Sequence, residues 1–532
     1  MSAATNIPAP PELAIVGPLP AESAEFRRRI ASISRQSAVY FGGTIFTAAA
    51  GYFFKIYLAR RLGAEALGLY ALGMSIVGFL GLFNAVGLPA AAARFVAQYY
   101  TSANFSRLGD FLRASLGLLS IGNVVLGAVV LAVGPWIAVH FYHAPVLSSY
   151  FLSFVLIMLF GVLNTFLGQA MAGYQDVSWR TVITHFIGTP ANILLAVILI
   201  SVGWGLRGYL VAQVASAFLV FLLLGRSVWS LTPVEARTTT KSMIVEKEVI
   251  AFSATAFGIA AVDFALSQAD KIVLGFYLSP RQVGVYAVAI ALVGFVPIAL
   301  QSVNQIFAPM IAELHASGNR ALLQQLYATL TKWIVILTLP LAFTMMIFAK
   351  PLIAIFGHDF EAGAAVLAIG ACGQLFNCAV GSVGYLLLMS GNQMQLIKIQ
   401  GCNAALMIGL SLFLVPRFGI AGAAVASAVA VISTNLWSLV AVSRCLHLFP
   451  YNAGYRKLIL CALISAAVLF ICLRGLSPAQ PPLMIAGIGF VAAYISFLGT
   501  LLLFGLDPDD RRFAAILWHH LGRRVRRNGV TS

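Results

Sequence analysis

The sequence predicts an all-α polytopic membrane protein with about 14 transmembrane helices. We expect two six-helix lobes related by an internal parallel repeat, followed by an additional C-terminal helix pair. The first observation is composition: of 532 residues, 60% are hydrophobic and 9% charged, against about 25% charged in soluble domains. The second is the length of the apolar runs, about 20 residues, which suits helices rather than barrel strands. The third is that one spanning pattern occurs twice.

The repeat begins at Lys55 and returns at Lys271, 216 residues later. Residues 55–79 and 271–295 align without a gap, and ten of the 25 positions are identical. Because each copy contains an even number of spans, both copies enter the membrane with the same orientation. Two like lobes enclose a natural cleft, and this architecture is typical of a transporter.

The apolar runs give the expected spans in order. They lie near 37–59, 66–93, 112–134, 147–170, 180–202, 207–230, 249–274, 282–308, 330–350, 361–389, 394–416, 419–443, 457–475 and 481–505. Several junctions are tight, so 12 or 13 spans would also fit. Spans and composition shifts together predict these regions: a disordered tail (1–36), a first lobe (37–230), a linker (231–248), a second lobe (249–443), the additional pair (444–505) and a basic tail (506–532).

The formal net charge of +16 is unevenly distributed. With residue 1 in the cytoplasm, the cytoplasmic segments hold 24 of the 33 Lys and Arg residues, as the positive-inside rule predicts. Basic clusters precede the first span and follow the last, so both termini are expected in the cytoplasm. The charge therefore indicates headgroup contact rather than nucleic-acid binding. All six cysteines lie in the second half without CxxC spacing, so neither a metal site nor a disulfide framework is expected.

Three motifs resemble those of a known family. They are residues 270–275 (DKIVLG) with 283–289 (VGVYAVA), residues 62–70 (LGAEALGLY), and residues 418–426 (FGIAGAAVA). The chain resembles the polysaccharide flippases of the multidrug/oligosaccharidyl-lipid/polysaccharide exporter superfamily. The resemblance implies two six-helix bundles arranged as a V, and flipping of undecaprenyl-pyrophosphate-linked oligosaccharide across a bacterial inner membrane by alternating access. It also implies the polysaccharide polymerase machinery as a partner, and leaves the glycan unidentified.

Several basic and amide side chains are candidates for binding that substrate. Lys55 and Lys271 lie near the far ends of repeat-related helices and could clamp the pyrophosphate from both lobes, or could snorkel to the headgroups. Arg61 and Arg94 could attract the anion or anchor helix ends. Asn304 and Gln305 could bind sugar hydroxyls, or could join helices by hydrogen bonds.

Two acids are candidates for coupling transport to H⁺ or Na⁺. Asp263 is expected to be buried in mid-span, where a charge is costly. Asp270 lies seven residues later, on the same helix face. The structural alternative is that Asp263 bonds a nearby hydroxyl or amide, and Asp270 bonds Lys271 or another basic residue.

Other functions of the same fold remain open. A lipid II flippase and a cation-coupled multidrug exporter are both compatible with the spans. The longest far-side loop has about a dozen residues, so an enzyme with an extramembrane catalytic domain is not expected. No Walker motif is present, so ATP is not the direct driver. No cofactor is expected, and a two-lobed cleft works in a monomer.

Overall fold

The computed structural model describes residues 20–238, 246–451, 455–476 and 480–504. Helices dominate throughout this part of the chain, as predicted. In order they are α1 (Pro20–Ala85), α2 (Leu88–Thr101), α3 (Phe105–His140), η1 (Pro145–Tyr150), α4 (Phe151–Gly173), α5 (Val177–Thr181), η2 (Val182–Gly188), α6 (Thr189–Ser201), α7 (Gly205–Leu231), α8 (Val234–Thr238), α9 (Lys247–Tyr277), α10 (Pro280–Val293), α11 (Ile298–Ala316), α12 (Arg320–Ile347), α13 (Ala349–Ala354), η3 (His358–Gly363), α14 (Ala364–Val380), α15 (Val383–Met389), α16 (Gln393–Leu446), α17 (Tyr455–Gly475) and α18 (Pro482–Leu503).

The protein is a multi-pass membrane protein. Eleven helices of the described residues are long and apolar enough to cross a membrane, or twelve if the bent pair α10 and α11 is one span. Two of the eleven are too long for one pass: a straight helix of 54 residues, the length of α16, would measure about 80 Å. A glycine with positive φ interrupts each of the two long helices, Gly63 in α1 and Gly419 in α16. The exact number of fourteen stays a prediction.

Repeated capping residues show why corresponding helices start where they do. Asn104 caps α3 by accepting a hydrogen bond from Arg107 N at 3.3 Å, and Asn319 caps α12 through Leu322 N at 3.2 Å. These two asparagines are 215 residues apart, close to the repeat offset. Each supplies an acceptor for a backbone N–H that has no partner within its helix.

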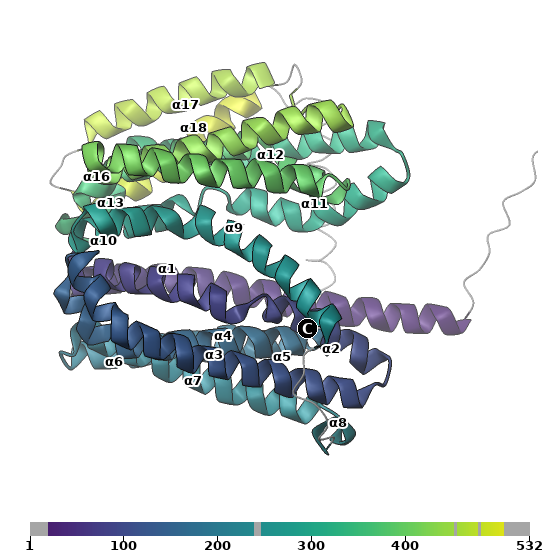
Figure 1. The fold of residues 1–532 in the computed structure, drawn as a ribbon. Helices are drawn as coiled ribbons and strands as arrows, with labels where there is room; N and C mark the ends of the chain where they lie inside the picture. Colours follow the sequence, from purple (N-terminus) through teal and green to yellow (C-terminus); the bar gives the residue numbers. More distant parts are fainter. Residues whose placement is uncertain (1–19, 239–245, 452–454, 477–479, 505–532) are drawn as a thin grey trace, which may run out of the picture.

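The helices form two lobes that lie one above the other in Figure 1. The first lobe contains α1–α7 and the second contains α10–α16. Helix α9 contacts both: its start packs beside α2, and its later part packs on α16. The additional pair α17 and α18 packs together and against α12. The domain boundaries within this arrangement stay predictions.

The hydrophobic cores show where the lobes join. One cluster combines residues of both lobes, among them Leu58, Leu72, Leu274 and Tyr286. Two further clusters are separate, one mainly in the first lobe and one in the second. The shared cluster lies toward the end that holds the α1 break at Gly63, which we call the far end. The lobes therefore meet at the far end and have separate cores toward the opposite, near end.

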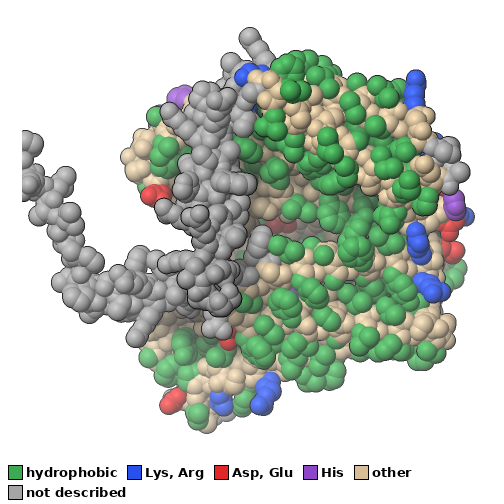
Figure 2. All heavy atoms as spheres, turned by 180° about the vertical axis from the view of Figure 1, so that it is seen from behind, with side chains coloured by type: hydrophobic (Ala, Val, Ile, Leu, Met, Phe, Trp, Pro, Cys, Tyr) green, Lys and Arg blue, Asp and Glu red, His purple; other side chains and the backbone are tan. Residues whose placement is uncertain are grey.

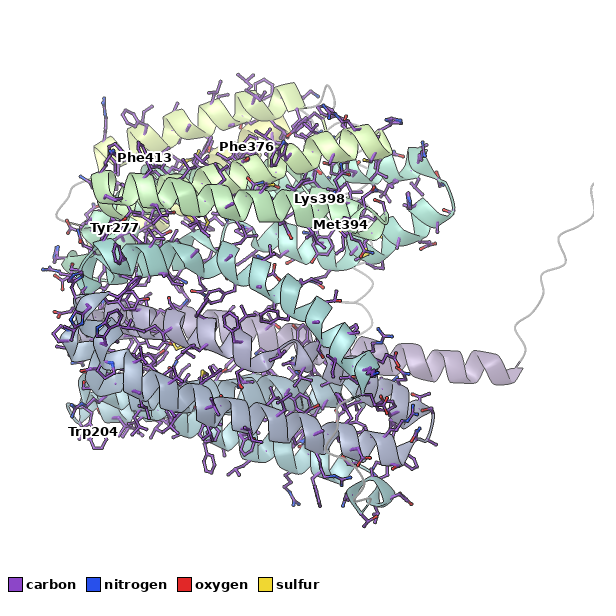
Figure 3. The ribbon with its side chains drawn as sticks, viewed as in Figure 1. Trp204, Tyr277, Phe376, Met394, Lys398 and Phe413 are labelled. Carbon is purple, nitrogen blue, oxygen red and sulfur yellow. The ribbon has the colours of Figure 1, made fainter. Side chains whose placement is uncertain are left out.

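Aromatic side chains mark the far end. Trp204 and Tyr277 both lie there in Figure 3, and both are exposed. Such residues are enriched where a membrane meets water. Lys398 and Met394 of α16 lie toward the near end in the same view.

One predicted region is corrected. Residues 1–36 were expected to be a disordered tail, whereas α1 begins at Pro20, so residues 20–36 are helical. A proline in the first turn of a helix loses no intrahelical hydrogen bond. Residues 1–19 and the basic tail lie outside the described residues. The six cysteines are free thiols: Cys372, Cys402 and Cys445 are exposed, Cys472 is partly buried, and Cys378 and Cys461 are buried.

Candidate functional site: a cavity between the lobes

A cavity of about 780 Å³ lies between the two lobes. Its walls come from α1 and α7 of the first lobe and from α9 and α10, with Phe356 at the far end. The face in Figure 2 is hollowed between the lobes, and hydrophobic side chains surround the hollow. The polar side chains that line the cavity are Thr47, Tyr52, Lys55, Tyr70, Tyr209, Gln268 and Lys271.

Lys55 and Lys271 both line this cavity. Lys55 precedes the α1 break at Gly63 by eight residues, and Lys271 precedes Ser279, in front of α10, by eight. The repeat thus places equivalent lysines on α1 and α9, in the wall of one cavity. Lys271 Nζ donates a hydrogen bond to Gln268 Oε1 at 2.8 Å. Within the described part of the chain, no carboxylate forms an ion pair with either lysine.

Asp270 is buried behind the cavity wall. Its side chain is 7% exposed and accepts a hydrogen bond from Tyr286 Oη at 2.7 Å. Its other oxygen accepts from the backbone N of Lys271 at 2.7 Å. Asp270 therefore bonds Tyr286 through its side chain and Lys271 through the backbone, and its role in ion coupling stays a prediction.

Asp263 is exposed. From the sequence, this residue was expected to be buried in mid-span, so that prediction was wrong. The reason lies in the path of α9. Near Asp270 the helix packs on α16, where Ala269 contacts Met407 and Ala430. Asp263 and Asp270 lie on the same face of α9, but this face is exposed at Asp263 and buried at Asp270.

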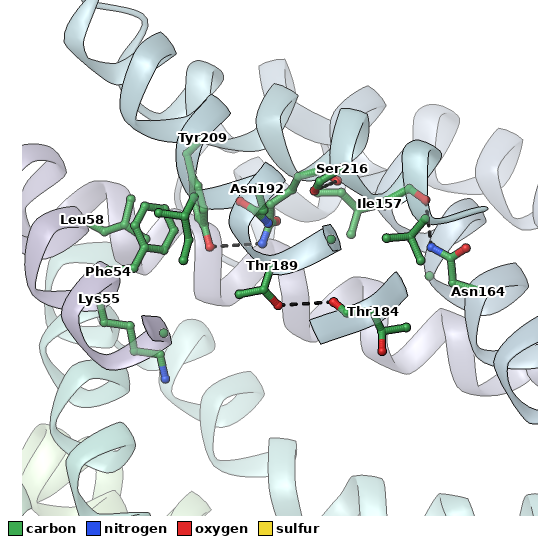
Figure 4. Close-up of a pocket in the computed structure, with 17 residues that line it drawn as sticks. Phe54, Lys55, Leu58, Ile157, Asn164, Thr184, Thr189, Asn192, Tyr209 and Ser216 are labelled. Carbon is green, nitrogen blue, oxygen red and sulfur yellow. Dashed lines mark hydrogen bonds between the residues drawn. The ribbon is translucent and has the colours of Figure 1, made fainter. Parts of the chain in front are cut away.

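A smaller cavity of about 420 Å³ opens from the first-lobe wall (Figure 4). We call it the side chamber. It lies between α1, α4, η2, α6 and α7, and it shares Gly51, Lys55, Leu58 and Tyr209 with the central cavity. In Figure 4 the Lys55 side chain extends away from Tyr209 and Asn192. The polar side chains that line the side chamber are Asn164, Thr184, Thr189, Asn192, Gln213 and Ser216.

One wall of the side chamber is a π-helical turn, η2. Pro190 follows it and has no N–H to donate to the preceding turn, which favours irregular helix geometry. Within η2, Thr184 and Gly188 line the chamber. His185 lies 2.8 Å from Thr47 Oγ1 through its Nδ1. Turns of this kind are frequent at functional sites.

Comparison with known proteins identifies the family. The family model described as polysaccharide biosynthesis protein matches residues 57–362. This chain belongs to the polysaccharide biosynthesis protein family. A curated relative is the probable low-salt glycan biosynthesis flippase Agl15 of Haloferax volcanii. It is 22% identical over 408 residues, which cover 74% of this chain and 80% of the relative.

Solved structures share the fold of this polysaccharide biosynthesis protein. The lipid II flippase MurJ in an inward closed conformation matches with a TM-score of 0.67 and 15% identity, over 91% of this chain and 99% of that chain. An inward-facing multidrug resistance MATE family transporter of the MOP superfamily matches with a TM-score of 0.60 and 15% identity, over 76% and 95%. The predicted two-lobed helical fold is therefore shared with these structures.

The remaining candidate residues of this polysaccharide biosynthesis protein line neither cavity. Arg61 and Gln305 are exposed, and Asn304 is buried with its Oδ1 unpaired. Arg94 lies 3.6 Å from a carboxylate oxygen of Glu248 and 4.8 Å from the ring centre of Phe252. It thus joins α2 to the start of α9.

Most residues of the side chamber were not predicted as site residues from the sequence. Asn164, Asn192 and Gln213 are single amides within long apolar runs. Such amides are costly in a membrane unless they are bonded or functional. The run at 180–202 also holds Pro190 within a set of threonines. This proline and its polar neighbours were the available signal for an irregular span.

Proposed function

We propose that this protein flips undecaprenyl-pyrophosphate-linked oligosaccharide across the bacterial inner membrane for surface polysaccharide synthesis. The family assignment, and the name of the Haloferax relative as a glycan biosynthesis flippase, support glycan transport. The cavity between two repeat-related lobes supports alternating access, in which the lobes rock about a central site. Both termini face the cytoplasm in this proposal, as the distribution of basic residues predicts.

One observation carries the choice of substrate: Lys55 of α1 and Lys271 of α9 line the same cavity. A charge removed from water is costly unless an opposite charge compensates it. Two lysines whose ammonium groups form no ion pair within the described residues therefore favour an anion in the cavity. A pyrophosphate diester carries two negative charges, one for each lysine.

The same lysines disfavour the exporter of cationic drugs. A cationic ligand in the central cavity would meet two like charges, and juxtaposed like charges cost several kcal/mol. Lipid II shares the pyrophosphate chemistry, so the lysines do not separate it from other lipid-linked glycans. The family assignment favours a polysaccharide precursor.

The mechanism follows from the two walls. In a cavity walled by both lobes, the headgroup can contact Lys55 of α1 and Lys271 of α9 while the lobes exchange their contacts. The lipid tail remains in the bilayer, because transferring it into the polar cleft would expose apolar surface. The protein contributes binding and a path, and no covalent step is needed.

The test uses a strain from which the gene is deleted. We expect intact lipid-linked oligosaccharide to accumulate in the cytoplasmic leaflet, and the wild-type gene to relieve it. Lys55→Ala/Lys271→Ala should fail to relieve it, whereas Lys398→Ala should relieve it, because Lys398 is exposed on α16 and lines neither cavity. Relief by the double variant would overturn the clamp. Normal surface polysaccharide without accumulation would overturn the flippase and favour drug export.

A further inference from the structure

Three amide side chains around the side chamber have an oxygen without a hydrogen-bond donor. They are Asn164 Oδ1, Asn192 Oδ1 and Gln213 Oε1. All three oxygens are almost completely buried. A buried acceptor without a donor is unfavourable and uncommon in folded proteins. Three of them around a cavity of about 420 Å³ form a local concentration of unpaired acceptors.

The amide nitrogens of two of these side chains are already bonded to the protein. Asn164 Nδ2 donates to the carbonyl oxygen of Ala217 at 2.9 Å. Gln213 Nε2 donates to Tyr70 Oη at 2.9 Å and to Tyr209 Oη at 3.1 Å. In both amides the nitrogen is therefore hydrogen-bonded and the oxygen is unpaired. The unpaired oxygens belong to side chains that line the chamber, and a ligand that brings donors would satisfy them.

The shape of the chamber fits a small ring. Gly51 and Gly161 line it, and a Cβ atom at either position would meet nothing within 4 Å. Phe54 and Tyr209 contribute aromatic rings whose centres are 5.9 Å apart. An apolar, aromatic wall with a few convergent polar groups is typical of a small-molecule site. A sugar presents C–H groups on its ring faces and hydroxyl donors on its rim, which matches both kinds of wall.

The position of the chamber links it to the proposed clamp. Lys55 lines both the chamber and the central cavity. A headgroup held by its pyrophosphate at Lys55 and Lys271 has its next chemical group within reach of the chamber mouth. In a lipid-linked glycan, that next group is the first sugar.

We infer that the side chamber is a saccharide subsite that binds the sugar adjoining the pyrophosphate, through hydroxyl groups donated to Asn164, Asn192 and Gln213. This inference rests on the proposed function and adds to it the part of the molecule that recognises sugar. Lys55 is the only charged side chain lining the chamber in the described part of the chain. No carboxylate of the described residues lines the chamber. The subsite therefore recognises neutral hydroxyl groups rather than a positively charged group.

The test compares two probes on purified full-length protein by native mass spectrometry. One probe is undecaprenyl pyrophosphate, and the other is the lipid-linked glycan extracted from the producing organism. We expect the wild type to prefer the glycosylated lipid. Asn192→Leu should reduce that preference about three- to tenfold, which corresponds to one lost hydrogen bond. Gly161→Leu should reduce it by at least about tenfold, because the added side chain fills open space. Both variants should bind undecaprenyl pyrophosphate as the wild type does.

Two matched controls separate the subsite from general damage. Asn403 in α16 is a buried amide whose Oδ1 is likewise unpaired, and Gly409 in α16 has nothing within 4 Å of its Cβ position. Neither lines the side chamber or the central cavity, so Asn403→Leu and Gly409→Leu should keep the wild-type preference. An unchanged preference in both chamber variants would overturn the subsite, as would equal binding of both probes by the wild type. Binding of neither probe would overturn the proposed function as well.

Discussion

Gly68 of α1 and Gly284 of α10 lie against each other's backbone across the two lobes. A Cβ atom at Gly68 would lie 3.0 Å from Gly284 N and would overlap the carbonyl oxygen of Pro280. A Cβ atom at Gly284 would lie 2.8 Å from Gly68 N and would overlap the carbonyl oxygen of Ala64. The two glycines are 216 residues apart, the repeat offset. The same sequence position from each copy therefore joins the lobes at the far end.

Alanine at either glycine should weaken this junction. Gly68→Ala forces α1 and α10 apart, and overpacking of this kind costs about 1–3 kcal/mol. We expect a lower thermal unfolding temperature in detergent and reduced flipping. Gly258→Ala in α9 is the control, because a Cβ atom there meets nothing within 4 Å. Equal stability of the two variants would show that the close approach is not required.

Removing the Tyr286 hydroxyl should destabilise the protein. Asp270 would lose its side-chain donor in a buried site, and an unsatisfied buried group costs about 1–3 kcal/mol. Thermal unfolding of Tyr286→Phe measures the loss, with Tyr277→Phe as an exposed control on α9. Asp270→Asn keeps an acceptor for Tyr286 and should be milder. If Asp270→Asn is stable but abolishes the effect of ion gradients, Asp270 couples ions rather than supporting α10.

Substitution of Arg94 should have a small effect. Its ion pair with Glu248 is largely exposed, with side chains 51% and 59% accessible, and such pairs contribute about 1 kcal/mol or less. Its contact with Phe252 adds about 0.5–1 kcal/mol at an exposed site. We therefore expect Arg94→Gln to lower stability slightly and to flip substrate nearly as the wild type does. A tenfold loss of flipping in a stable Arg94→Gln protein would instead support a role in substrate entry.

Asp263→Asn tests the proposed coupling to an ion. The variant removes a charge from an exposed position on α9 and forms no new contact in the core. If Asp263 binds H⁺ or Na⁺, flipping by Asp263→Asn in vesicles should lose its response to an imposed gradient of that ion. Glu65→Gln, another exposed acid on α1, serves as the control. An unchanged response in Asp263→Asn would exclude this residue.

The sequence repeat predicted the features that depend on symmetry. Lys55 and Lys271 were predicted, as repeat-related residues, either to clamp a pyrophosphate or to snorkel to the headgroups, and both line the central cavity. The helical fold and the family were predictable for a different reason. Apolar run length and turn motifs are local properties of the chain, so they can be read from the sequence directly.

Features that depend on particular neighbours were not predictable in this way. The burial of Asp270 depends on its contact with Tyr286 of α10, and Asp263, two turns earlier on α9, is exposed. The side chamber lies in the first lobe, where η2 departs from regular helix geometry. A pattern shared by both copies carries no information about a feature that only one copy has.

The distribution of cysteines makes the two lobes experimentally distinct. The first lobe contains none, and the three exposed thiols of the described residues, Cys372, Cys402 and Cys445, all belong to the second. Replacing those three would leave a background in which one introduced thiol per lobe can carry a spin or fluorescent label. Distances between such labels would then record the rocking of the lobes directly, in the membrane and during turnover.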